Sequence, residues 1–81
     1  MIIYVLLTNS EWVGGVSPNF NDVFERGEKH SSYEFQIEMW DATENKRLDV
    51  ALFQRFSDDG DWYLMGISEL STQWIPKEYL Q

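Results

Sequence analysis

Hydrophobic and polar positions alternate without a break over residues 33–40. This period of two places successive side chains on opposite faces and predicts a half-buried antiparallel strand. One face is expected to be apolar and buried, and the other polar and exposed. The apolar face consists of Tyr33, Phe35, Ile37 and Met39, and the polar face includes Glu34, Glu38 and Trp40.

A second alternating run covers residues 47–56 and predicts the next strand. We expect Leu48, Val50 and Leu52 to lie on its buried face. The alternation drifts near Phe53, and an extra residue at that point would form a bulge.

The segment Ser-Asp-Asp-Gly-Asp at residues 57–61 predicts a tight turn, because Gly60 can take the positive φ that such turns require. Residues 62–67 then predict a third strand. We therefore expect a meander in which the strands at 33–40, 47–56 and 62–67 pair in chain order.

The first part of the chain predicts a further pair of strands. Residues 2–7 form an apolar run that is too short to span a bilayer and that no basic residue precedes, so we expect a buried strand. Residues 12–16 are expected to form its short partner.

A short helix or a structured loop is expected over residues 18–29. Ser17 is suited to the N-cap position and Pro18 to the first helical residue. Gly27 should end the helical pattern early.

The last residues predict a return strand followed by one helical turn. Residues Gln73–Ile75 are expected to form a short strand. Pro76 ends it, because proline has no N–H to donate to the hydrogen bonds between strands. Lys77–Leu80 is long enough for a single 3₁₀ turn.

This order of elements resembles the C-terminal half of an SH3 domain. Residues 60–63, Gly-Asp-Trp-Tyr, match a Gly-Asp-Trp-Trp-like strand, and residues 74–80 match the aromatic–aliphatic–Pro–x–x–Tyr–aliphatic close. The resemblance implies a groove for proline-rich ligands lined by Trp62, Pro76 and Tyr79. The opening Ala-Leu-Tyr-Asp-Tyr segment and long acidic loop of the family are not recognisable earlier in the chain.

Together these patterns predict one mainly β domain over residues 1–81, with modest room for a core. We expect an antiparallel meander, or an SH3-like small barrel, of about five strands with at most one short helix.

The charge balance narrows the classes of partner. Fourteen acidic residues against six basic ones give a net charge of −8. This disfavours direct binding to nucleic acid or to a membrane, which both reward a basic face. It favours a protein partner with a basic surface, or serves only to keep an aromatic-rich domain soluble. The absence of cysteine indicates a reducing cytoplasm.

Residues suited to catalysis or metal binding are few. His30 is the only histidine, lies in a polar segment and has no cysteine to act with, so we interpret it as a surface residue. Asp58, Asp59 and Asp61 resemble a fragment of a calcium loop, but the glutamate that would complete it is not at the required spacing. We therefore expect no catalytic residue, no metal and no cofactor.

Two binding hypotheses remain. In size and charge the chain resembles small acidic phage proteins that antagonise host defence, such as anti-CRISPR proteins and DNA mimics. That resemblance implies an inhibitor or decoy that docks, in the host cytoplasm, on the basic surface of a nucleic-acid-processing complex. The alternative is an SH3-like adaptor for proline-rich segments. The expected partner-binding residues are Asp58, Asp59, Asp61, Trp62, Pro76, Tyr79, Trp40, Glu34 and Glu38.

Overall fold

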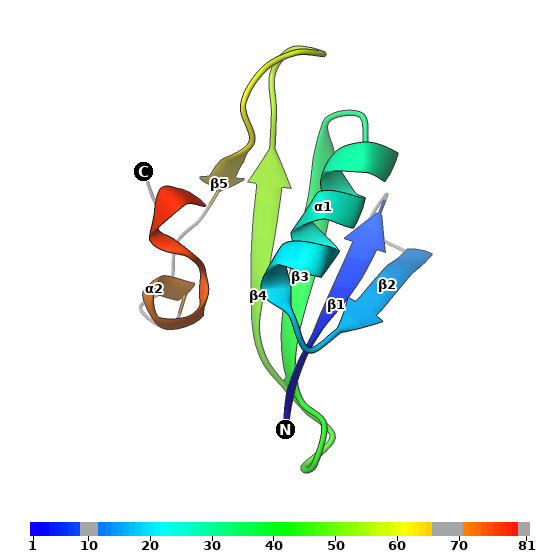
Figure 1. Cartoon of the computed structure of the whole chain (residues 1–81), viewed down its shortest axis with the longest axis vertical. Helices are drawn as coiled ribbons and strands as arrows, with labels where there is room; N and C mark the ends of the chain where they lie inside the picture. Colours follow the sequence, from blue (N-terminus) through cyan, green and yellow to red (C-terminus); the bar gives the residue numbers. More distant parts are fainter. Residues whose placement is uncertain (9–11, 66–70, 80–81) are drawn as a thin grey trace.

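The computed structural model describes residues 1–8, 12–65 and 71–79, and shows one antiparallel sheet with helical segments on one face (Figure 1). The strand order is β2-β1-β3-β4-β5. The strands are β1 (Ile2–Thr8), β2 (Trp12–Ser17), β3 (Glu34–Asp41), β4 (Lys46–Gln54) and β5 (Tyr63–Met65), and the helical segments are α1 (Phe20–His30), α2 (Ser71–Trp74) and the 3₁₀ turn η1 (Lys77–Tyr79).

The predicted mainly β fold and its meander are confirmed. β3, β4 and β5 pair antiparallel in chain order, and β1 pairs with the other side of β3. The sheet is open, with β2 and β5 at its two edges. The meander is therefore the form observed among the two expected architectures. The described part of β5 is shorter than predicted, and residues 66–67 lie outside the described ranges.

Helix α1 connects β2 to β3 across one face of the sheet. Both strands run antiparallel to β1 and lie on its two sides, so they are parallel to each other and need a crossover. The N-cap is Asn19, whose side-chain oxygen accepts a hydrogen bond from the N–H of Asn21 at 2.9 Å. The prediction of Ser17 as the cap and Pro18 as the first helical residue is therefore wrong by two residues. Ser17 instead accepts a hydrogen bond from the Asn19 N–H, at 3.0 Å.

The helix does not end at Gly27, as the sequence pattern predicted, but continues to His30. Gly27 is buried, and a Cβ at this position would come within 2.6 Å of the Phe35 ring. The glycine therefore marks a close contact between helix and sheet. The helix is closed by the N–H of Ser31, which donates to the carbonyl of Gly27 at 3.0 Å.

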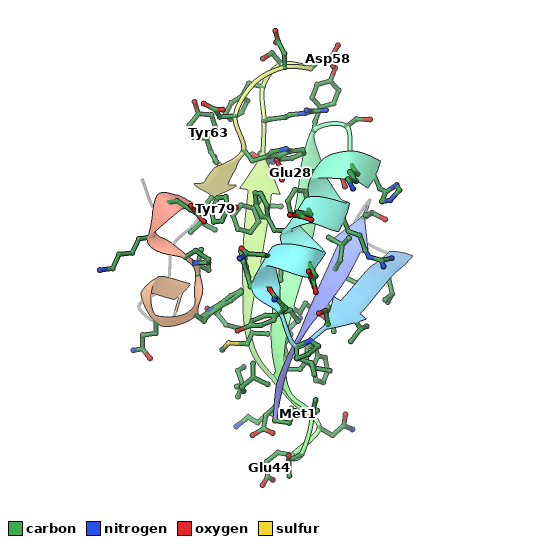
Figure 2. All side chains as sticks on the ribbon, in the orientation of Figure 1. Met1, Glu28, Glu44, Asp58, Tyr63 and Tyr79 are labelled. Carbon is green, nitrogen blue, oxygen red and sulfur yellow. The ribbon has the colours of Figure 1, made fainter. Side chains whose placement is uncertain are left out.

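The two hairpins of the meander point to opposite ends of the molecule, as the positions of Glu44 and Asp58 show (Figure 2). In the β4–β5 hairpin the N–H of Gly60 donates to the carbonyl of Ser57 at 3.1 Å, which confirms the predicted turn. Gly60 does not adopt the expected positive φ, and the atom nearest to a Cβ built there is the exposed Ser57 Oγ, at 2.6 Å. The positive φ occurs at Asn45, at 53°, in the β3–β4 hairpin.

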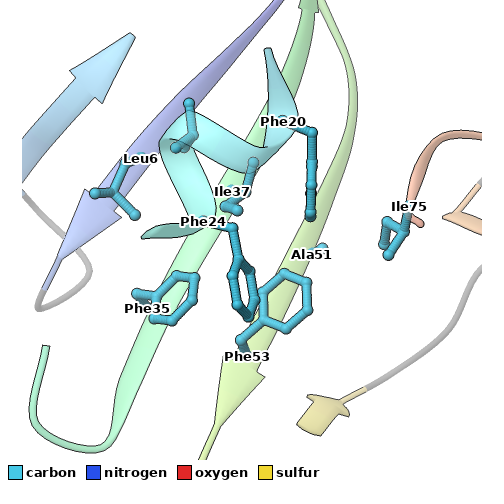
Figure 3. Close-up of a cluster of buried hydrophobic side chains, with 9 residues drawn as sticks. Leu6, Phe20, Phe24, Phe35, Ile37, Ala51, Phe53 and Ile75 are labelled. Carbon is cyan, nitrogen blue, oxygen red and sulfur yellow. The ribbon is translucent and has the colours of Figure 1, made fainter. Parts of the chain in front are cut away.

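The core lies between α1 and the face of the sheet that α1 covers, which we call the inner face (Figure 3). Phe24 is central: its ring centroid lies 5.1 Å from that of Phe53 and 5.4 Å from that of Phe35. These edge-to-face contacts are favourable arrangements for aromatic rings. The buried members of the core are Leu6, Phe20, Val23, Phe24, Phe35, Ile37, Ala51, Phe53 and Ile75.

The alternation predicted for β3 is confirmed. Phe35, Ile37 and Met39 are buried on the inner face. Tyr33 is the exception, because it precedes the strand and is 53% exposed.

The prediction for β4 chose the wrong face. Ala51 and Phe53 are fully buried, whereas Leu48 and Val50 are exposed. Leu52 is half-buried and shares their face, because neighbouring residues of a strand alternate.

The bulge lies at Leu48 and not near Phe53. The register pairs Met39 with Asp49 but Trp40 with Arg47, so Leu48 is the extra residue of β4. Asp49, a polar residue on the inner side, accepts a hydrogen bond from Trp74 Nε1 at 2.8 Å. This hydrogen bond explains how the inner side accommodates a carboxylate, although the alternation pattern had placed Asp49 in solvent.

The C-terminal segment packs beside α1 over the inner face instead of extending the sheet. The strand predicted at 73–75 is wrong, since the chain forms α2 there. Trp74 stacks on Tyr4 with ring centroids 5.7 Å apart, so tertiary packing overrides the local preference for a strand. The 3₁₀ turn is confirmed at η1, where the Tyr79 N–H donates to the Pro76 carbonyl at 3.0 Å. The last residue predicted for that turn, Leu80, lies outside the described ranges.

Candidate functional site

Seven of the nine predicted partner-binding residues lie on two different surfaces. The first is a pocket of about 440 Å³ beside the β4–β5 hairpin, which we call the aromatic pocket. The second is the face of the sheet opposite α1, which we call the outer face. Of the predicted residues, Asp59, Asp61, Trp62 and Tyr79 line the aromatic pocket, whereas Glu34, Glu38 and Trp40 lie on the outer face.

Three elements form the aromatic pocket: the hairpin, the C-terminal half of α1 and η1. Glu28, Tyr63 and Tyr79 lie toward the end of the molecule that carries Asp58 (Figure 2). The lining residues are Phe24, Glu28, Arg55, Asp59, Gly60, Asp61, Trp62, Tyr63, Glu78 and Tyr79.

Trp62 connects the pocket to the core. It is half-buried, and its ring meets that of Phe35 edge-on at 4.7 Å between centroids. The Arg55 guanidinium lies 4.9 Å from the Trp62 ring centroid, and its Nε donates to the carbonyl of Ser32 at 2.6 Å. Trp62 therefore already binds one cation through its ring.

Tyr79 is held by packing on the core. Its ring lies 4.2 Å from that of Phe24, centroid to centroid. Burial raises the pKa of the Tyr79 hydroxyl, and the nearby carboxylates of Glu78 and Glu28 raise it further. The hydroxyl therefore remains protonated well into alkaline solution, and can donate a hydrogen bond to a ligand.

The pocket is strongly acidic. Four carboxylates line it, from Glu28, Asp59, Asp61 and Glu78, against the single guanidinium of Arg55. Burial raises the pKa of Glu28, as does the neighbouring Glu25, and Arg55 partly offsets both effects. The electrostatic field of the pocket therefore favours a cation.

Replacing Glu28 with glutamine should stabilise the protein at neutral pH and leave it unchanged in acid. Because the folded-state pKa lies above the ordinary value near 4.5, stability falls as the pH rises through that window and stays reduced above it. Glutamine removes this loss. Water screens the exposed part of the group, so we expect a gain in Tm of roughly 1–2 °C at pH 7. Thermal unfolding at pH 7 and pH 4 measures the effect, and a variant less stable than wild type at pH 7 would contradict it.

Asp58 is not a lining residue of the aromatic pocket. It accepts a hydrogen bond from the Tyr33 hydroxyl at 2.9 Å, which ties the hairpin tip to the start of β3. This hydrogen bond raises the pKa of the Tyr33 hydroxyl. Of the three aspartates expected to bind a partner, Asp58 therefore also makes a contact within the fold.

Pro76 does not line the aromatic pocket, although Trp62 and Tyr79 do. A second, more apolar pocket of about 430 Å³ lies beside β5, and Pro76 is not among its lining residues either. That pocket is lined by Phe56, Trp62, Tyr63, Leu64, Met65, Glu78 and Tyr79.

Sequence reasoning missed several pocket residues. Glu28 and Arg55 come from segments distant in the chain, so no local pattern assigns them to the pocket. Glu78 and Tyr63 are direct neighbours of predicted residues, and their adjacency was the one available signal.

The outer face holds its polar residues in a small network. Glu38 accepts hydrogen bonds from Arg47 Nη1 at 2.9 Å and from Trp40 Nε1 at 3.1 Å. Glu34 accepts one from Gln54 Nε2 at 2.7 Å. Trp40 is half-buried on this face and anchored by its indole N–H, instead of standing free in solvent.

His30 is the last residue of α1 and is exposed, as expected for a surface histidine. Within residues 1–8, 12–65 and 71–79, no group of three or more His, Cys, Asp or Glu side chains is placed to hold a metal ion. Over the same described ranges, no helix has the length and apolar character needed to cross a bilayer.

Comparisons with protein-family models, with curated proteins and with solved structures found no match to this chain. The two surfaces are therefore the features of the molecule that bear on its function.

Proposed function

We propose that this chain is a non-catalytic binding protein whose aromatic pocket receives basic side chains from the surface of a protein partner. The observation that supports this most is the joining of four carboxylates with the rings of Trp62 and Tyr79 in one pocket. Carboxylates attract a guanidinium or ammonium group, and aromatic faces contact the apolar stem that carries it.

The placement of Arg55 supports the same chemistry. A guanidinium from the chain itself lies over Trp62, beside a pocket that still holds an excess of carboxylates. The net charge of −8 extends the attraction over a longer range and increases the association rate with a basic partner.

More specifically, we propose that the chain acts as an inhibitor of its partner. A basic channel that normally holds nucleic acid phosphates would present Lys and Arg side chains to such a pocket, and the bound chain would exclude the nucleic acid. An anti-CRISPR-like decoy in the host cytoplasm is one case. The supporting features are the charge and the pocket chemistry.

An isothermal titration with a synthetic arginine- and lysine-rich peptide tests the pocket. Asp59→Asn combined with Asp61→Asn should weaken binding about fivefold or more, mainly at low salt, because salt screens exposed charges over a Debye length of about 8 Å at physiological ionic strength. Glu44→Lys at the opposite hairpin changes the net charge by the same amount and should weaken binding less than about twofold. Equal losses in both variants would show that only net charge matters.

The alternative function is an SH3-like adaptor for proline-rich segments. The convergence of Phe56, Trp62 and Tyr79 on the apolar pocket favours it, whereas the position of Pro76 outside that pocket does not. The same titration with an uncharged proline-rich peptide separates the two functions. On the adaptor hypothesis, Trp62→Phe should weaken binding of the proline-rich peptide while it retains a ring against Phe35. If the wild type does not bind this peptide, the adaptor hypothesis is excluded.

A further inference from the structure

The aromatic pocket and the apolar pocket beside β5 share a wall. Four residues line both of them, so the two pockets are direct neighbours. Tyr63 of β5 and Tyr79 of η1 are two of the four (Figure 2), and the others are Trp62 and Glu78. We call the surface that the two pockets form together the two-part groove, with an aromatic half and an apolar half.

The two halves of this groove differ in chemistry. The residues that line only the aromatic half include the carboxylates of Glu28, Asp59 and Asp61. Glu78 adds a carboxylate on the shared wall, so an anionic amphiphile such as a fatty acid is disfavoured in either half. The residues that line only the apolar half all have apolar side chains: Phe56, Leu64 and Met65. A ligand that fills both halves therefore needs a cationic group and an apolar group close together.

The carboxylates of the aromatic half are open to a ligand. Asp59 and Asp61 are exposed, and within the described parts of the chain their side chains form no ion pair and no hydrogen bond. Arg55, the cation that lines this half, is held instead by the carbonyl of Ser32 and the ring of Trp62. The aromatic half therefore retains unpaired acceptors for a basic side chain.

Phe56 lies at the apolar half without taking part in the core. Its side chain is 72% exposed, and it is not a member of the buried cluster. Its ring stacks on that of Tyr63 with centroids 6.2 Å apart, and Met65, which lines the same half, is 38% exposed. An aromatic ring at the rim of an apolar pocket, with most of its surface in water, is suited to contact an apolar side chain of a partner.

We propose that the two-part groove binds one extended segment of the protein partner. The segment places a Lys or Arg side chain in the aromatic half and a large apolar side chain, such as that of leucine, in the apolar half. The two side chains are two residues apart in the segment. This inference rests on the function proposed for the aromatic pocket, and it adds the second anchor by which the partner is recognised.

The place of the apolar half favours an extended segment. This half lies between β5, a strand at the edge of the sheet, and η1. A groove along an edge strand is a common binding site for extended peptides. In such a peptide the side chains of residues i and i+2 point the same way, about 7 Å apart. That spacing suits two neighbouring pockets that share one wall.

Three short peptides of equal length test the proposal by NMR titration at low salt. The core of the first is Leu-Ser-Arg-Ser-Leu, which places a leucine two residues from arginine in both chain directions. Serines replace both leucines in the second peptide, and glutamine replaces arginine in the third. We expect the first peptide to bind about tenfold more tightly than the second, because it buries a leucine side chain, and the third to bind too weakly to saturate.

Phe56→Ala tests the apolar half from the side of the protein. This variant should reduce the affinity ratio of the leucine and serine peptides from about tenfold to below about threefold. Val13→Ala is the matched control, because Val13 is 63% exposed on β2, at the opposite edge of the sheet, and it should keep the ratio at about tenfold. Asp59→Asn combined with Asp61→Asn should weaken both arginine peptides alike, because it changes only the aromatic half.

The two-part groove is overturned if the leucine and serine peptides bind equally, if Phe56→Ala retains the gain, or if the glutamine peptide binds as tightly as the first. It is also overturned if a peptide with proline in place of leucine binds more tightly, or if the wild type forms a dimer that Phe56→Ala dissociates. If neither arginine peptide binds but the arginine- and lysine-rich peptide does, the groove is overturned and the proposed function stands. If no basic peptide binds, both fail. Thermal unfolding of each variant checks that its fold is retained.

Discussion

Replacing Gly27 with alanine should lower the free energy of unfolding by about 2 kcal/mol, even though alanine favours a helix by about 1 kcal/mol over glycine. The reason is the contact between α1 and the sheet. A Cβ on Gly27 would lie 2.6 Å from two Phe35 ring atoms. The ring cannot move away, because Phe24, Phe53 and Trp62 surround it with centroids at 5.4, 5.3 and 4.7 Å.

Urea denaturation of a double-mutant cycle measures this effect. Phe35→Leu alone should destabilise the domain, because it removes ring contacts in the core. Combined with Gly27→Ala, the smaller leucine leaves room for the new methyl group, so the combined loss should be clearly less than the sum of the two. Additive losses, or a Gly27→Ala variant more stable than wild type, would show that the close contact is not what requires glycine.

Replacing Phe53 with alanine should cost about 3–5 kcal/mol, the largest loss expected from a single substitution. Phe53 is fully buried, and its ring contacts those of Phe24, Phe35 and Tyr79. Free energies of unfolding are roughly 0.05–0.15 kcal/mol per residue, so a loss of this size removes much of the stability of a domain of 81 residues. The variant should therefore be partly unfolded at 37 °C.

Phe56→Ala is the matched control, because this residue lies three positions further along the same hairpin and is 72% exposed. It should change the unfolding free energy by less than about 0.5 kcal/mol. Circular dichroism against temperature, with urea titration at 25 °C, separates the two variants. Similar melting curves for both would place Phe53 outside the core.

Local periodicity was sufficient to predict the meander, because the residue patterns that indicate a strand or a turn lie within each single strand or turn. The unbroken alternation of residues 33–40 assigned the inner face of β3 correctly from Phe35 onward, and Ser57–Gly60 supplied the turn. In β4 the same reasoning chose the wrong face. The bulge at Leu48 shifts the pattern, and Asp49 satisfies its carboxylate with the Trp74 indole, a partner from a distant segment.

The candidate site was predictable only in part. Trp62, Pro76 and Tyr79 were expected from the resemblance to SH3 domains, and of these Trp62 and Tyr79 line one pocket whereas Pro76 does not. Glu28 and Arg55 reach that pocket through the packing of α1 and β4, which no local pattern encodes. The helix predicted to stop at Gly27 shows the same limit, because glycine serves helix–sheet contact there and not termination.

The stacking of Tyr4 on Trp74 has a consequence for how the chain folds. Tyr4 belongs to the first strand and Trp74 to the C-terminal helical segment, so their contact closes a loop that spans almost the whole sequence. Loops of this length form late, after the local hairpins of the meander. During synthesis, Phe20 of α1 can contact the Tyr4 ring early, but the ring face that Trp74 covers stays open until Trp74 has been made. This part of the core therefore forms after the sheet and α1, and the strands must avoid aggregation until then.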